Sequence, residues 1–263
     1  MGKIKKTPDE MSFLEHLEDL RTRLFRAFIS IFVAVIPAYI FSQEIFRFLA
    51  KPLTQFLPEG EKLAFRTLTE PFMLYIKVSF LAALFAVSPY VFYQLWKFIA
   101  PGLYQKEKKY VVPFVLFTSV FFLGGAAFAY YIAYPFACQF FLKLGSEFKP
   151  VITVDDFFGL TIKMLLGIGL VFEMPTLIFF LSKMGLVTSR WMIKNYKYAV
   201  LVVFIIAAVI TPTPDMISQS ILAVPMLILY TLSILVAFLF GKERHGRKER
   251  RAKKKEEPSG NAG

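Results

Sequence analysis

One acidic residue, Glu173, lies in the middle of a long apolar segment, in the run LVFEMPTLIFF. An ionised carboxylate deep in a membrane is costly, so such a residue normally faces a cavity or a partner. A protonated Glu173 that is hydrogen-bonded in the protein interior is an equally good explanation. Pro175 follows two residues later and should distort a helix here, because proline lacks the backbone N–H and crowds the preceding turn.

A second acid, Asp19, lies in a charged segment before the first apolar run. Thr7, Pro8 and Glu10 can cap and open a helix there. This helix carries an apolar stripe suited to a membrane surface or to another helix, formed by Phe13, Leu17, Leu20 and Leu24. Asp19 is either a functional acid or a solvated residue paired with Arg23 one turn later, and the residues alone favour the pair.

A third acid, Glu107, stands among Lys106, Lys108 and Lys109 in the loop FIAPGLYQKEKKY. It is either a receptor group held in place by the surrounding aromatic and proline residues, or a locally paired acid in a basic loop. Composition alone favours the second interpretation.

Motifs for enzymatic or metal chemistry are not found in this sequence. It has no HExxH, no Cys/His cluster, no nucleophile elbow and no phosphate loop, and its one cysteine, Cys138, has no second cysteine in the chain to pair with. We therefore predict that the chain is not an enzyme and binds no cofactor and no metal. An intramembrane enzyme would need a catalytic dyad or metal site within the spans. The stronger alternative from Glu173 is a proton-coupled small-solute transporter.

The elements that must position these residues are apolar helices. Hydrophobic residues make up 56% of the chain, and its mean hydropathy is +0.55. A helix needs about 20 apolar residues to cross a bilayer. We predict an all-α membrane protein with six spans, at residues 24–41, 71–99, 110–142, 157–181, 198–210 and 221–240. The third is too long for a straight perpendicular span. The last two are short and form a hairpin across TPTPDMISQS, so lipid thinning or partners must accommodate them.

Basic residues set the expected orientation. With six spans, the loops and ends on one side carry 21 Lys and Arg, against 6 on the other side, which places both termini in the cytoplasm. The net charge is +12, and nine Lys and Arg lie between Lys242 and Lys255, after the last apolar run, where they fit orientation in a membrane, so we expect no nucleic-acid partner. We expect no cleavable signal peptide. The predicted organisation is a cytoplasmic amphipathic helix (1–23), a transmembrane domain (24–240) and a basic, disordered tail (241–263).

Five blocks of sequence together resemble the TatC family, the large subunit of the twin-arginine translocase. These blocks are HLEDLRTRL (16–24), KPL (51–53), YQLWKFIAPGLYQKEKK (93–109), FEMP (172–175) and TPTPDMISQ (211–219). The resemblance extends over residues 12–240 and keeps the order and spacing of the blocks. It implies a subunit of the cytoplasmic (inner) membrane that binds the twin-arginine signal peptides of folded cargo. It also implies self-association and assembly with TatA- and TatB-type single-span subunits to export cargo with the proton-motive force.

The resemblance also assigns roles to particular residues. The family's signal-contacting acids fall on Asp19 and Glu107, its intramembrane acid on Glu173, and its outer hairpin acid on Asp215. Other matched positions important in the family are Arg21, Pro52, Gln94 and Phe98. One departure is that the family usually has Glu at position 19. The Asp19 side chain is one methylene shorter than that of glutamate, and the adjacent Glu18 points about 100° away around a helix.

Overall fold

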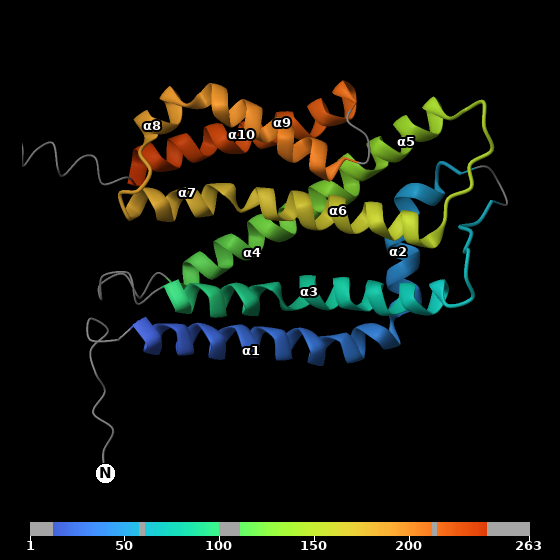
Figure 1. Ribbon diagram of the computed structural model, residues 1–263, viewed down its shortest axis with the longest axis horizontal. Helices are drawn as coiled ribbons and strands as arrows, with labels where there is room; N and C mark the ends of the chain where they lie inside the picture. The colour runs from blue at the N-terminus through green and yellow to red at the C-terminus, as the bar shows by residue number, and fades with distance from the viewer. Residues whose placement is uncertain (1–12, 58–60, 100–110, 212–214, 241–263) are drawn as a thin grey trace, which may run out of the picture. The chain divides into compact units, whose positions relative to one another are not determined.

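The computed structural model describes residues 13–57, 61–99, 111–211 and 215–240, and these residues are almost entirely helical (Figure 1). The helices in chain order are α1 (Phe13–Ile40), α2 (Ser42–Thr54), α3 (Glu70–Ile99), α4 (Val111–Phe128), the π-helical turn η4 (Ala129–Ala133), α5 (Tyr134–Leu144), α6 (Val154–Phe172), α7 (Met174–Lys183), α8 (Ser189–Lys194), α9 (Tyr196–Ile210) and α10 (Met216–Phe240). The chain forms two compact units, Met1–Gly169 and Leu170–Gly263, and each is described by itself.

Among the described residues, five helical segments are long and apolar enough to cross a membrane, and a sixth apolar helix is shorter. The five are Leu17–Ile40, Glu70–Phe98, Val112–Leu144, Val154–Lys183 and Met216–Leu239, and the shorter one is Tyr196–Ile210. They match the six predicted spans in order and type, so the prediction of an all-α, multi-pass membrane protein is confirmed.

In the first unit, α1 and α3 lie side by side and antiparallel (Figure 1). The rings of Phe32 and Phe80 meet edge to face between them, with centroids 6.4 Å apart. The end of α3 is held against α4 by a buried hydrogen bond, in which Trp96 Nε1 donates to Thr118 Oγ1 across 3.1 Å. This bond joins the second and third spans on either side of the undescribed residues 100–110.

The third span is interrupted by the π-helical turn η4. The N–H of Tyr134 donates to the carbonyl of Ala129, five residues earlier. In an α-helix it would donate to the carbonyl four residues earlier. Pro135 gives the physical reason, because it has no N–H for the carbonyl of Tyr131 and its ring crowds that turn. The whole span has 33 residues, about 50 Å of helix at 1.5 Å per residue. The prediction that it is too long for a straight perpendicular span is confirmed.

The segment after the first span corrects the sequence interpretation. The predicted spans 24–41 and 71–99 leave residues 42–70 as a loop, yet residues 42–54 form the amphipathic helix α2. Its buried side includes Leu49, Pro52 and Leu53, and it packs on α3 and α5. Apolar residues recur in this segment at helical spacing, and that pattern could have predicted the helix. Thirteen residues reach only about 20 Å, so α2 is too short to span a membrane.

In the second unit, α7 and α9 both pack on α10. Ser182 Oγ donates to the carbonyl of Ala237 across 3.3 Å, and Tyr230 donates its hydroxyl hydrogen to the carbonyl of Met192 across 3.1 Å. These bonds fix α7 and the short helix α8 against α10.

The prediction that both of the last two spans are short holds for α9 but not for α10. Helix α9 has 15 residues, whereas α10 has 25 and starts five residues earlier than expected. The reason is a cap, because Asp215 Oδ2 accepts a hydrogen bond from the N–H of Ser218 at 2.8 Å. A carboxylate at this position stabilises a helix start.

Candidate functional site

The packing of α1 on α3 fixes which residues share a level at one end of the first unit. Asp19 lies thirteen residues before Phe32 on α1, and Tyr93 lies thirteen residues after Phe80 on the antiparallel α3. Both helices rise 1.5 Å per residue, so the contact between Phe32 and Phe80 places Asp19 level with Tyr93 and Gln94. Two blocks of sequence that are about 70 residues apart are thereby brought to the same end of the helix pair.

Asp19 is partly exposed on α1 and is held by an ion pair. Its Oδ2 lies 2.7 Å from Nε of Arg23, one turn along the helix. This is the pair that the residues alone favoured. Arg21 lies on the exposed surface of the same helix. The predicted site therefore has a carboxylate with one positive neighbour already in place.

Gln94 is buried near the end of α3, and only 5% of its surface is exposed. Its Nε2 donates to the Tyr90 hydroxyl across 2.6 Å, while its Oε1 is buried without a hydrogen-bond partner among the described residues. A buried carbonyl oxygen without a donor costs roughly 1–3 kcal/mol. Oε1 is therefore a ready acceptor for a cationic donor that enters this end of the helix pair.

Several aromatic residues lie near Gln94 along α3. The rings of Tyr90 and Tyr93 lie 6.4 Å apart, and the Lys97 ammonium lies 5.4 Å from the centre of the Tyr93 ring. Phe98 is half-buried at the end of the helix. Glu107, the second acid predicted to contact signal peptides, lies outside the described residues.

Glu173 lies at the break between α6 and α7, and only 7% of its surface is exposed. Its N–H donates to the carbonyl of Leu170 at 3.1 Å, a tighter turn than an α-helix makes. Helix α7 then starts at Met174, with Pro175 in its first turn, where a missing N–H costs nothing. The predicted distortion at Pro175 is confirmed.

The family model for the Sec-independent protein translocase protein TatC matches residues 15–225. The chain belongs to the TatC family. A TatC from Koribacter versatilis is 44% identical over 94% of this chain and 92% of its own length, and one from Desulforapulum autotrophicum is 40% identical over 95% and 92%.

Two crystal structures of a twin-arginine translocase receptor, TatC, have the same fold. They superpose with TM-scores of 0.74 and 0.76, and each is 34% identical to this chain. Each alignment covers 85% of this chain, and 98% or 99% of the other. This TatC chain is thus a multi-pass membrane protein and a subunit of the twin-arginine translocase.

Asp215 of this TatC chain is a helix cap in the structure, as described for α10. From the sequence we assigned Asp215 to the outer hairpin and missed its role as a helix cap. An aspartate directly before the first residue of a helix is a common N-cap. Residues 212–214, on the other side of Asp215, lie outside the described residues.

A network of ion pairs that the sequence did not predict joins the loops at the other end of the first unit of this TatC chain. Lys77 Nζ lies 2.7 Å from Asp155 Oδ1, Arg66 lies 3.1 Å from Asp156, and Lys149 lies 3.1 Å from Glu61. A backbone bridge between Ala64 and Thr153 runs through the same region. Lys77, near the start of α3, thus pairs with an acid in the first turn of α6.

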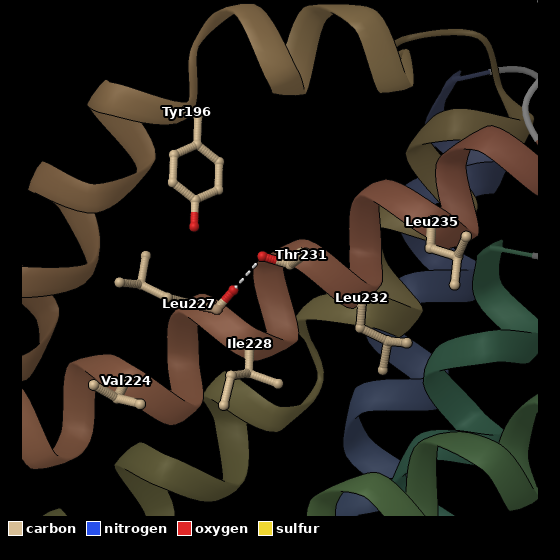
Figure 2. Close-up of a pocket in the computed structure, with 7 residues that line it drawn as sticks. All are labelled: Tyr196, Val224, Leu227, Ile228, Thr231, Leu232 and Leu235. Atoms are coloured by element: carbon tan, nitrogen blue, oxygen red, sulfur yellow. Dashed lines mark hydrogen bonds between the residues drawn. The ribbon is translucent and has the colours of Figure 1, made fainter.

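The second unit of this TatC chain carries a shallow apolar groove on α9 and α10 (Figure 2). Its volume is about 620 Å³, and it is lined by Tyr196, Val224, Leu227, Ile228, Thr231, Leu232 and Leu235. Figure 2 shows the Tyr196 side chain directed towards α10, while Thr231 donates its hydroxyl hydrogen to the carbonyl of Leu227 at 2.8 Å. None of the described residues that line the groove is charged, so it suits an apolar surface.

Proposed function

We propose that this chain is the signal-peptide receptor of the twin-arginine translocase and that it exports folded cargo with the proton-motive force. The observation that carries the proposal is the shared level of Asp19 and Gln94 on the antiparallel pair α1 and α3. It supports one binding site assembled from two distant sequence blocks. Membership of the family also supports the proposal, because the similar crystal structures are of a twin-arginine translocase receptor.

The chemistry of the signal fits this end of the helix pair. Two adjacent arginines present planar forks of N–H donors that remain charged, and they pair best with carboxylates. Asp19 offers one carboxylate, and we propose Glu107 as the second. Gln94 Oε1 offers a buried neutral acceptor at the level of Asp19. Phe98, Tyr93 and Arg21 complete the proposed contact surface.

We further propose that this end is cytoplasmic and that the chain lies in the cytoplasmic (inner) membrane with both termini inside. Support comes from the 21 Lys and Arg on that side against 6 on the other. Without the C-terminal tail the balance is still 12 against 6. The ion pairs around Lys77 and Asp155 would then lie on the opposite face of the membrane.

The apolar groove on α9 and α10 is our proposed docking surface for a TatA- or TatB-type single-span subunit. Helix α9 reaches only about 22 Å, less than the roughly 30 Å of hydrocarbon. A partner helix packed in the groove would separate the short helix α9 from the thicker lipid layer. It would also cover Val224, Ile228 and Leu235, which are all more than half exposed. Self-association of the chain belongs to the same proposal.

Site-specific crosslinking tests the receptor proposal. A photoreactive residue next to the arginine pair of a labelled signal peptide should crosslink to α1 near Asp19 and to α3 near Gln94 in the purified chain. Replacing both signal arginines with glutamine is the matched control and should abolish the crosslinks. Crosslinks that persist with the glutamine peptide would contradict the proposal. A proton-coupled solute transporter, which the family does not favour, would show no specific crosslink.

A further inference from the structure

We propose that a cavity between α2, α3 and the α4–η4 segment holds one acyl chain of a phospholipid, whose phosphate lies against Arg47 and Lys51 of α2. The cavity has a volume of about 350 Å³ and lies wholly within the first unit. An apolar cavity of about 150 Å³ already stays dry and binds small hydrocarbons. This one is more than twice as large and therefore has room for a longer hydrocarbon.

The π-helical turn and two small residues create the space. Ala126 and Ala127 line the cavity just before η4, where larger side chains would fill it. Tyr130, within the turn, stacks on Phe48 with ring centroids 4.4 Å apart and donates its hydroxyl hydrogen to the Phe48 carbonyl at 2.6 Å. The hydroxyl hydrogen of Tyr130 is thus already used in a hydrogen bond to α2. The cavity therefore offers water few polar partners.

The cavity opens on the side that faces lipid. Its inner wall includes Leu81, which is only 2% exposed, whereas Phe48 is 52% and Tyr131 is 68% exposed. Ala127 and Tyr131 belong to the third apolar span, Val112–Leu144. A dry cavity that opens through a membrane-spanning surface is in contact with hydrocarbon. The molecule at hand to fill it is a lipid chain rather than a water-soluble ligand.

Helix α2 supplies a place for the head group. It is amphipathic and too short to span, and a helix of this kind lies at the level of the head groups. Arg47 and Lys51 are exposed and one turn apart, on either side of the position of Phe48 in the sequence. Neither forms an ion pair with a described residue, and Glu44 is the one acid on α2. The exposed surface is therefore net positive and suits a phosphate diester.

Photolabelling of the full chain in phospholipid nanodiscs tests the proposal. The probe is phosphatidylethanolamine with a diazirine in the middle of one acyl chain, and the labelled peptides are mapped by mass spectrometry. We expect labels in residues 45–49 and 123–131. Ala127→Phe should lower this labelling at least about tenfold, because its ring occupies the space of several methylenes. Val120→Phe is the control, since Val120 is 67% exposed on the same helix but does not line the cavity.

Equal labelling in the two phenylalanine variants would overturn the proposal, because the cavity would then be no different from other lipid-facing surface. Ala126→Leu fills the cavity by a smaller volume and provides a second test if thermal unfolding shows that Ala127→Phe does not fold. Arg47→Gln with Lys51→Gln should lower the labelling several-fold. Unchanged labelling in that double variant would remove the phosphate from the proposal.

Discussion

Arg23 donates from its Nε to Oδ2 of Asp19 across 2.7 Å, so the acid proposed to read the signal already has a cationic partner. An ion pair one turn apart on a helix is worth only about 0.2–0.5 kcal/mol. A hydrogen bond from a signal arginine to a carboxylate is worth about 1.5–3 kcal/mol. The signal can therefore displace Arg23 or share the carboxylate with it, and Arg23 keeps the carboxylate oriented until the signal binds.

Asp19→Ala should weaken signal-peptide binding about tenfold to a hundredfold, since one charge-assisted hydrogen bond is lost. Glu107→Ala should weaken it similarly, and the double variant should lose more than either single variant. Asp19→Glu should be tolerated. Binding is measured by titration of the purified chain with a fluorescent twin-arginine peptide.

Glu18→Ala is the matched control, because Glu18 is the exposed neighbour that points elsewhere on the helix. Arg23→Gln should leave binding unchanged or strengthen it. If Asp19→Ala and Glu107→Ala both bind the peptide normally, these acids are only solvated charges.

Glu173→Ala should impair export of folded cargo and leave signal-peptide binding largely intact. The residue is buried at the break between α6 and α7, and we predict that it faces an interior concavity. Export is measured with a reporter protein in membrane vesicles, and binding by crosslinking. A loss of binding equal to the loss of export would instead assign Glu173 to the receptor step.

Gly169→Ala should destabilise the first unit by about 1–3 kcal/mol. A Cβ at Gly169 would lie 3.1 Å from Cε2 of Phe122. Phe122 cannot retreat easily, because it is buried between the rings of Phe85 and Phe92, whose centroids lie 5.2 and 5.3 Å away. Thermal unfolding in detergent measures the change.

Gly124→Ala is the control on the neighbouring helix, where a Cβ would meet nothing within 4 Å. It should leave stability unchanged or raise it by up to about 1 kcal/mol, as alanine favours a helix over glycine. Equal destabilisation by both substitutions would show that the approach of α6 to Phe122 is not responsible.

Thr153→Ala should cost about 0.5–2 kcal/mol, because Thr153 caps the start of α6. Its Oγ1 accepts a hydrogen bond from the N–H of Asp156 at 3.2 Å and donates to the Asp156 carboxylate at 2.6 Å. Thr54→Ala is the control, since the Thr54 hydroxyl is exposed and makes only a 3.4 Å contact with the Lys51 carbonyl. The same melting temperature for both variants would refute the role of this cap.

Cysteine labelling tests the six-span topology. We expect Lys194→Cys to be labelled by a membrane-impermeant maleimide from the cytoplasm and Met216→Cys only from the opposite side. Both positions are exposed, and the native Cys138 is buried, so the background should be low. Labelling of Met216→Cys from the cytoplasm would make α9 a re-entrant segment and contradict the topology.

The sequence alone determined the class of this protein, the order of its spans and the break at Pro175. These features depend on local physics, because an apolar run long enough for a bilayer and a missing proline N–H need no distant partner. The same local signals were less reliable for α2 and for the start of α10. Helix α2 is held by the burial of one of its faces, and the start of α10 is set by the cap from Asp215.

Only the tertiary structure decided which distant residues share a place. The level of Asp19 with Gln94 follows from the packing of Phe32 on Phe80, and the pairing of Lys77 with Asp155 follows from how the loops meet. The same is true of the cavity beneath Phe48 and Tyr130. Periodicity shows which face of a helix is apolar, but the register between two helices is set by the interlocking of their side chains, and that depends on both helices together.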